Sequence, residues 1–542
     1  MDTPAYLHLV AQAEEATARD DFSTAAGLWH DVTDVNPTGG YLWYRLGQAE
    51  YESGRYEAAL TAFEQAGERG VCHRRPQFVR LPAELALDIA RCHARLGNRE
   101  AAIESITAAV ELGLYDLNEL SDDVFKDVAD DRRFRQLTMP SAPAERNAGW
   151  RTDLTLLTAE ILRRSPVAHR YGNDVARAST ELERRIPVLS DARIVAEFHR
   201  ILALLGDGHA FITTTQPELP LRLFRFEETV VVIAAPPRLA HLIGGELTAV
   251  DDRPVDDVLA ELEPLVARDN RQQLLNDGTT RLRDIATLHA LGLTERPDRA
   301  VIDVTGPTGV QRVTVHTVDV PAPSRMNRFR PDGWVWLPEK AERTPLHLAR
   351  LAEPYWYEYL PDHDLFYFGF NSVVEDGKSP LPSFFADMFD HFDEVKPYRF
   401  VVDVRWNGGG NTFKALELLN RVLARPDLNR PDRLFVITGR NTFSAAQNTV
   451  TTLWLHTDAT FVGEPTGSSP NFTGEVVGFQ LPHSGLTANV SDLHWQTSVP
   501  LDHRTWIEPD LYAPPRLSDW LAGHDPALAA ITRYPRRDGS DA

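Results

Sequence analysis

Apolar positions follow a helical period in the first part of the chain and alternate between strands and helices in the last part. From 148 to 206 they recur at spacings of three and four, as in Ile194, Phe198, Ile201 and Leu205, which predicts amphipathic helices. Beyond 355 the predicted strands are 365–370, 400–404, 433–438 and 460–463, and the predicted helices are 382–392, 413–423 and 444–455. This alternation predicts a layered sheet covered by helices.

A β-rich stretch, 216–320, separates these two patterns. Its strand-like runs are broken by Gly244-Gly245 and by the turn Gly306-Pro307-Thr308-Gly309. The order of a strand, a Gly-Gly strand and a helix resembles a reduced PDZ-like module. Residues 321–354 are rich in proline, arginine and charge, which is typical of a linker or a surface excursion.

An internal repeat occupies the first 138 residues. Similar segments begin at Asp21, Arg55 and Asn98, each placing small alanines after a helix that ends in a polar or glycine turn. The first spacing is 34 residues and the second is 43, with the extra residues in the proline-containing stretch 72–82. This pattern resembles tetratricopeptide repeats, which implies a helical solenoid over 1–138 that binds a partner protein or peptide. The alternative is a helical domain that only packs against its neighbour.

Composition narrows the classes of function. A chain of 542 residues is too long for one core, so we expect several domains in a multidomain α+β protein. Acidic residues number 78 against 56 basic ones, for a net charge of −22, and no basic stripe is present, so no nucleic-acid partner is expected. The start Met1-Asp2-Thr3-Pro4-Ala5 lacks a signal peptide and no apolar run is long enough for a membrane span, which predicts a cytoplasmic protein with no membrane association.

No cofactor is predicted. The two cysteines, Cys72 and Cys92, are too few for a disulfide framework or a closed zinc site and are interpreted as core or surface thiols. The chain also lacks a zinc-protease helix motif, a phosphate-binding loop with lysine, and a dinucleotide fingerprint. We therefore expect neither a metal nor a nucleotide.

Two glycine- or small-residue-rich loops follow predicted strands in the last region. The first contains Asn407-Gly408-Gly409-Gly410, whose backbone N–H groups can turn inward without Cβ clashes and so suit an oxyanion hole. The second leads to Ser444 at the start of a predicted helix, where the helix dipole favours a developing alkoxide. Each feature alone has an ordinary alternative, because triple glycines are common in loops and serine is a preferred helix cap.

Together these loops resemble a known protease core. The pattern Asp403-Val-Arg-x-Asn-Gly-Gly-Gly, then Thr-x-Ser444-Ala-Ala, then Val462-Gly-Glu-Pro-Thr-Gly resembles the carboxy-terminal-processing (tail-specific) serine protease family and the related tricorn core protease. The resemblance covers 355–520 well and reaches Gly206-Asp207-Gly208-His209 more loosely. It implies a ClpP/crotonase-like layered core over 355–525, preceded by a helical part of the protease over 148–215. It assigns Ser444 as nucleophile, with an oxyanion hole formed by Gly408 or Gly409 and by Ala445.

The general base departs from the best-known family pattern. Those members use a lysine after the serine in a Gly-Lys-Gly setting, whereas this chain reads Gly467-Ser-Ser-Pro-Asn there and contains no lysine after Lys414. The tricorn-like branch instead uses a histidine from an Asp-x-His motif, which His209 matches. By the same resemblance Asp502 orients that histidine, with Glu475 and Glu508 as alternates. A solvated loop carboxylate is the alternative interpretation of Asp502.

These observations predict a serine endopeptidase-like hydrolase that cleaves peptides or unstructured protein segments. The missing lysine, and Gln447 where many relatives carry glutamate, leave two alternatives open. One is a protease-like protein without turnover that binds a peptide or an apolar ligand. The other is an interaction scaffold whose repeats bind the partner.

Overall fold

The chain divides into two compact units, Met1–Ala144 and Glu145–Ala542. The computed structural model describes residues 3–71, 80–138, 143–214, 216–319, 329–375, 377 and 379–536. Cys72 lies outside the described residues, whereas Cys92 is buried in a helix of the first unit. No helix of the described part combines the length and the apolar character that a membrane span needs.

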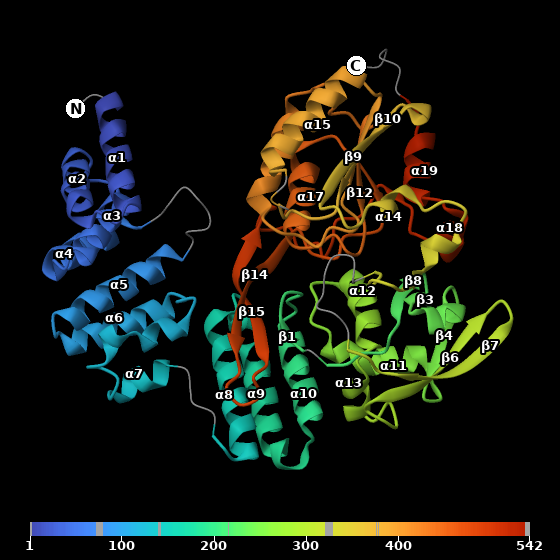
Figure 1. Cartoon of the computed structure of the whole chain (residues 1–542), viewed down its shortest axis with the longest axis horizontal. Coiled ribbons are helices and arrows are strands. Elements are labelled where there is room, and N and C mark those ends of the chain that lie inside the picture. The colour runs from blue at the N-terminus through green and yellow to red at the C-terminus, as the bar shows by residue number, and fades with distance from the viewer. Residues whose placement is uncertain are drawn as a thin grey trace. The chain divides into compact units, whose positions relative to one another are not determined.

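The first unit is a series of helices that pack in antiparallel pairs (Figure 1). Buried alanines, among them Ala25, Ala59 and Ala102, lie between these helices and let them approach closely. The helices are α1 (Thr3–Ala18), α2 (Phe22–Val35), α3 (Gly40–Glu52), α4 (Tyr56–Arg69), α5 (Leu81–Arg95), α6 (Arg99–Glu111) and α7 (Arg132–Leu137). The predicted helical repeats are therefore confirmed.

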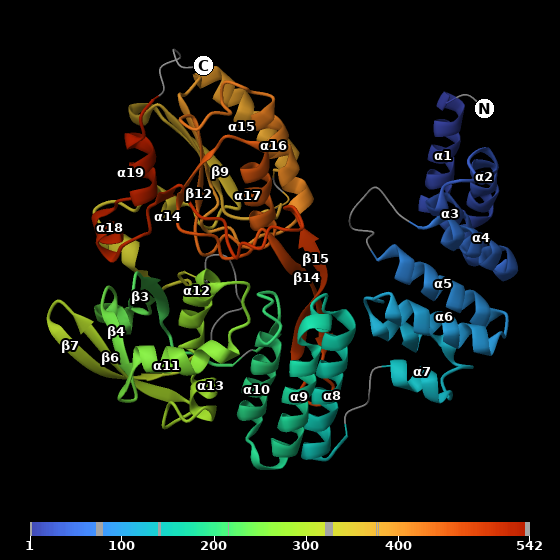
Figure 2. The same cartoon turned by 180° about the vertical axis from the view of Figure 1, so that it is seen from behind.

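The second unit begins with three long helices, α8 (Arg146–Arg164), α9 (Ala168–Arg185) and α10 (Asp191–Ala203). A short strand, β1 (Phe211–Thr213), follows them and pairs antiparallel with β15 (Thr487–Gln496) of a long hairpin whose other strand is β14 (Asn471–Gln480). Figure 2 shows this hairpin reaching from the layered sheet to the helices. The connection joins segments that are far apart in the sequence.

A buried carboxylate fastens the tip of the hairpin to α8. Asp153 accepts hydrogen bonds from the backbone N–H groups of His483 and Ser484 at 2.8 and 2.9 Å. The His483 ring also packs edge-on against Trp150 of α8. The helical part and the layered sheet are thereby linked through side chains as well as through strand pairing.

The β-rich module is an antiparallel sheet in the order β2-β3-β4-β6-β7. Its strands are β2 (Arg222–Phe226), β3 (Thr229–Ala235), β4 (Glu246–Val250), β6 (Arg299–Gly306) and β7 (Gly309–His316), with β5 (Arg253–Pro254) paired to β4. Its helices are α11 (Val255–Leu262), α12 (Arg271–Arg281) and α13 (Ile285–Ala290). The β-rich character is as predicted, and the likeness to a PDZ module stays a prediction.

The expectation of a linker over 321–354 needs correction for its described part. Strand β8 (Val335–Trp336) pairs with β3, and helix α14 (Leu346–Ala349) follows. Trp336, Leu348 and Leu351 are buried in the core of the β-rich module. Proline and arginine dominated the sequence pattern there, but these few large apolar side chains are enough to anchor the segment. Residues 321–328 lie outside the described part.

The layered core is built on a six-stranded sheet in the order β16-β13-β12-β11-β10-β9. Only β9 runs antiparallel to its neighbour; the others pair in parallel. The strands are β9 (Tyr355–Leu360), β10 (Leu365–Phe370), β11 (Arg399–Asp403), β12 (Leu434–Thr438), β13 (Thr460–Gly463) and β16 (Leu511–Tyr512). The three central strands are buried along their whole length, as expected for a parallel sheet covered on both faces.

Helices cover both faces of this sheet (Figure 1). The first face carries α15 (Leu381–Val395), α16 (Leu416–Leu423) and α17 (Ala445–His456), with Phe385, Phe389 and Val450 in its core. The opposite face carries α19 (Pro526–Arg533), where Ala527 and Ile531 pack on Tyr367, Val401 and Phe435; α18 (Leu517–Ala522) precedes it. The core therefore extends beyond the predicted limit of 525.

Candidate active site

Ser444 lies at the sharp turn between β12 and α17. It occupies the N-cap position of the helix with φ 57° and ψ −126°, a left-handed conformation that costs a non-glycine residue about 1–3 kcal/mol. Its side chain makes no capping hydrogen bond and is partly exposed. The ordinary role of a helix-capping serine is therefore not the role of Ser444, whose hydroxyl is left free at a strained turn.

The glycine loop lies directly against Ser444. Gly409 has φ +109°, and a Cβ atom added to it would lie 2.7 Å from Cβ of Ser444 and 3.0 Å from the backbone nitrogen of Ala445. Buried Asn407 ties the two loops together, because its side chain accepts from the Gly409 N–H at 2.9 Å and its carbonyl accepts from the Phe443 N–H at 3.1 Å. The sequence predicts that these glycines lie beside Ser444, and in the structure Gly409 does so.

The backbone donors predicted for an oxyanion hole differ in their availability. The N–H of Gly409 already donates to Asn407. Among the described residues no acceptor is hydrogen-bonded to the N–H of Gly408 or of Ala445, and Ala445 is the first residue of α17. The pair that remains free to bind an oxyanion is thus Gly408 and Ala445.

His209 lies in the loop between α10 and β1 and is only 9% exposed. Its ring stacks on Phe443, the residue before Ser444, with ring centroids 4.3 Å apart, and on Phe472 of β14 at 5.7 Å. Among the described residues no side chain donates to or accepts from either ring nitrogen, and the nearest polar group is the Thr473 backbone. Burial lowers the pKa of His209 to about 4, against a small opposing effect of the Thr473 backbone, so the imidazole is neutral at pH 7.

Among the described residues, His209 forms no hydrogen bond or ion pair with any of the three predicted acids. Asp502 accepts hydrogen bonds from Arg504 and, at 2.7 Å, from Ser498; the Arg504 bond keeps the pKa of Asp502 well below its ordinary value. Glu475 is exposed at a left-handed position of β14, and Glu508 is exposed 3.9 Å from Arg504. Arg504 and Ser498 thus occupy the carboxylate that the family resemblance assigned to the histidine.

The carboxylate beside His209 is Asp207, the acid of the same Asp-x-His motif. One Asp207 oxygen accepts the His209 backbone N–H at 2.8 Å and lies 3.8 Å from ring Nδ1. A second carboxylate, Asp269, accepts the Gly208 N–H at 2.7 Å and a hydrogen bond from Ser468. Burial raises the pKa of Asp207 to about 6 and that of Asp269 to about 7. Asp269 lies just before α12, and no sequence motif marks it.

A cavity of about 920 Å³ adjoins this loop. Asp269 lines it together with Arg200 of α10, Arg225 of β2, and Leu259 and Leu274 of α11 and α12. Its volume lies at the upper end of the range typical of ligand pockets. Charged and apolar side chains share its wall, which suits a peptide that carries both kinds of group.

Gln447, which stands where many members of the resembled family carry glutamate, lies in α17, one turn beyond Ser444. Its side chain is fully buried and donates to Thr451 at 3.2 Å.

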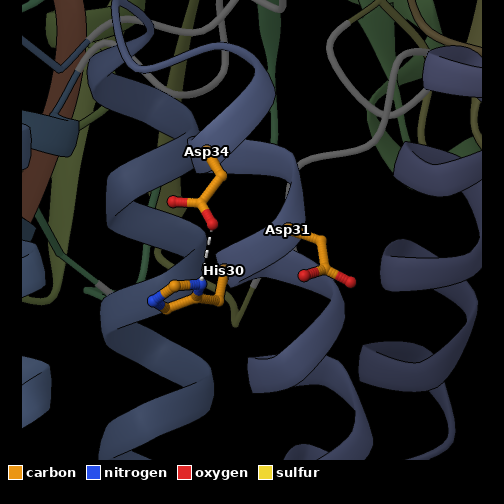
Figure 3. Close-up of side chains that lie close together, drawn as sticks. All are labelled: His30, Asp31 and Asp34. Carbon is orange, nitrogen blue, oxygen red and sulfur yellow. Dashed lines mark ion pairs between the residues drawn. The ribbon is translucent and has the colours of Figure 1, made fainter. Parts of the chain in front are cut away.

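A second group of histidine and carboxylates, His30, Asp31 and Asp34, lies on the exposed face of α2 (Figure 3). His30 and Asp34 form an ion pair of 3.4 Å one helical turn apart, which is ordinary surface pairing.

Comparison with known proteins supports two classes of structure in the chain. Residues 41–68 and 83–112, which span α3–α4 and α5–α6, match the tetratricopeptide repeat family. A larger part of the chain matches solved structures in its fold. No curated protein matches the chain by sequence.

Among solved structures, mature CPAF complexed with lactacystin matches with a TM-score of 0.52 at 14% identity, over 71% of this chain and 98% of that chain. A CPAF mutant gives 0.51 at 14% identity, over 72% and 99%. The photosystem II D1 C-terminal processing protease also matches at 12% identity, over 71% and 96%, with a TM-score of 0.34. The two CPAF matches confirm the predicted resemblance at the level of fold.

Proposed function

We propose that the second unit is a serine-type endopeptidase that cleaves peptides or unstructured protein segments, with Ser444 as its nucleophile. The observation that carries the proposal is the strained, uncapped Ser444 packed against Gly409. A strained turn persists only where the surrounding structure enforces it, and such turns cluster at functional sites. The protease fold shared with CPAF adds support.

In the proposed reaction, His209 takes the hydroxyl proton while the Ser444 oxygen attacks the peptide carbonyl. The carbonyl oxygen becomes an oxyanion that accepts from the N–H groups of Gly408 and Ala445. The carbon–nitrogen bond then breaks as His209 returns the proton to the leaving amine. A water molecule, deprotonated by His209, attacks the acyl ester and releases Ser444.

The neighbourhood of His209 supports this role in two ways. Its ring stacks on Phe443, so it belongs to the same local structure as the nucleophile. It is also neutral, as a base must be before it accepts a proton. For the orienting acid the geometry favours Asp207, which lies 3.8 Å from Nδ1, over Asp502, which is held by Arg504.

A fluorophosphonate probe tests the proposal, because it forms a covalent bond with an activated serine and releases fluoride. We expect labelling of the wild type, none in Ser444→Ala, and a loss of at least about 100-fold in His209→Ala. His503→Ala is the matched control, since His503 is exposed in the same unit and should label normally. Normally folded wild type without labelling would instead support the alternative of a peptide-binding protein without turnover.

A further inference from the structure

A buried cluster beside the proposed nucleophile is built like a cation site. Asp207, His209 and Asp269 each offer one ligand atom, and these atoms lie within 4.8 Å of one another. Asp207 is fully buried, His209 is 9% exposed and Asp269 is half-buried. Asp207 and His209 have only neutral neighbours as further hydrogen-bond partners, Ser491 for Asp207 and the Thr473 backbone for His209, and none of these meets strict hydrogen-bond geometry.

The two carboxylates also lack a counter-charge. In the described part of the chain neither Asp207 nor Asp269 forms an ion pair with lysine or arginine, although the unit contains many other such pairs. A buried carboxylate without a partner is costly, and proteins resolve that cost by protonation, by pairing or by coordinating a metal. A cation among these three groups would supply a counter-charge to both carboxylates at once.

Neighbouring residues hold the cluster in place. The Gly208 N–H donates to Asp269, and Ser468 donates to its other oxygen. Gln273 donates to the Gly208 carbonyl at 3.1 Å and accepts from the Asp269 N–H at 2.8 Å. A Cβ atom at position 208 would lie 2.2 Å from the end of the Gln273 side chain and would displace the amide that holds the loop. Such outer hydrogen bonds are what orient the ligands of metal sites.

The donor set indicates the class of cation. One imidazole and two carboxylates suit a first-row divalent ion, and Zn²⁺ binds both donor types at about 2.0–2.2 Å. Two ligands at tetrahedral angles around Zn²⁺ lie about 3.4 Å apart, so the widest pair would close by at most about 1.4 Å. The exposed trio on α2 offers no comparable burial.

We propose that Asp207, His209 and Asp269 form a binding site for a first-row divalent cation of the Zn²⁺ type. The sequence predicted no metal site, because Asp269 is distant from the Asp-x-His motif and carries no motif of its own. A regulatory consequence rests on the proposed function: a cation that coordinates His209 occupies the nitrogen lone pair that the base needs, so the bound ion holds the hydrolase inactive.

Titration of the metal-free full chain with Co²⁺, followed by competition with Zn²⁺, tests the site by its visible absorption. We expect one tight site per chain with a coordination band, weakened at least about 10-fold in Asp207→Asn and in Asp269→Asn. The double variant His30→Ala/Asp34→Asn, which alters the exposed trio, should leave that band and its affinity unchanged. Zn²⁺ should also raise the wild-type melting temperature, and a chelator should reverse the rise.

Two results would overturn the site: no coordination band in the wild type, or affinity that persists in both aspartate variants. The thermal shift of the wild type keeps the test decisive if either variant fails to fold, because a shift of zero contradicts the proposal. Fluorophosphonate labelling with and without Zn²⁺ separates the two proposals. Labelling absent under both conditions rejects the proposed hydrolase, while the Co²⁺ spectrum still decides the metal site. Labelling that Zn²⁺ leaves unchanged rejects the regulatory consequence.

Discussion

Gly409→Ala tests the contact between the glycine loop and the nucleophile. The substitution adds a methyl group at φ +109°, 2.7 Å from Cβ of Ser444 and 3.0 Å from the backbone nitrogen of Ala445. The left-handed conformation costs alanine about 1–2 kcal/mol, and forcing the neighbours apart costs about 1–3 kcal/mol more. The sum is about 2–5 kcal/mol. For a unit of about 400 residues, that loss lowers the melting temperature by about 2–6 °C.

Gly309→Ala is the matched control for this prediction. Gly309 has φ +105° at the first position of β7, but a Cβ atom there meets nothing within 4 Å. We expect a decrease of only about 1–2 °C, from the backbone conformation alone. Calorimetry measures both variants, and fluorophosphonate labelling should fall at least about 100-fold in Gly409→Ala only. Equal melting temperatures for the two variants, with normal labelling, would refute the placement of the loop against Ser444.

Three further changes test other parts of the structure. Deletion of 1–138 should leave a cooperative unfolding transition in calorimetry, because 145–542 is a separate compact unit. Loss of that transition would show that the second unit needs the repeats to fold. Asp153→Ala should lower the free energy of unfolding by about 1.5–3 kcal/mol and reduce fluorophosphonate labelling, because it releases the hairpin tip at His483. A calorimetric melting temperature equal to that of the wild type would contradict this. Burial alone would raise the pKa of Asp525, but its pairing with Arg405 prevails and holds it at about 2. Because folding favours the ionised form of Asp525, that carboxylate contributes about 2 kcal/mol to the free energy of unfolding above pH 4. This contribution is lost as the pH falls to about 2. The melting-temperature difference between wild type and Asp525→Asn should therefore narrow over that range, and a pH-independent difference would contradict the pairing.

Local patterns were sufficient to predict the layered core. The predicted strand 365–370 coincides with β10, and the predicted helix 444–455 differs from α17 by one residue at each end. Continuous apolar runs identify strands buried on both faces, and the shift to a helical period identifies what covers them. The turn that carries Ser444 was predictable for the same reason, because it joins two elements that the pattern had already located.

Side-chain partnerships between distant segments were not predictable in this way. Asp502 has the spacing of an orienting acid, but Arg504, two residues away, takes its carboxylate. Asp269 reaches the Gly208 N–H only because α12 packs beside the loop after α10. A single sequence contains no record of which carboxylate a folded loop will face, so these assignments depended on the three-dimensional structure.

The pairing of β1 with β15 imposes an order on the synthesis of the protein. His209 emerges early from the ribosome, but the strand that fixes its loop, β15, is made about 280 residues later. At about 5–20 residues per second, translation separates the two events by about 15–60 s. During that interval the nascent chain has no partner for β1, and Ser444 is added only toward its end. The loop that carries His209 therefore gains its strand partner only late in the synthesis of the chain.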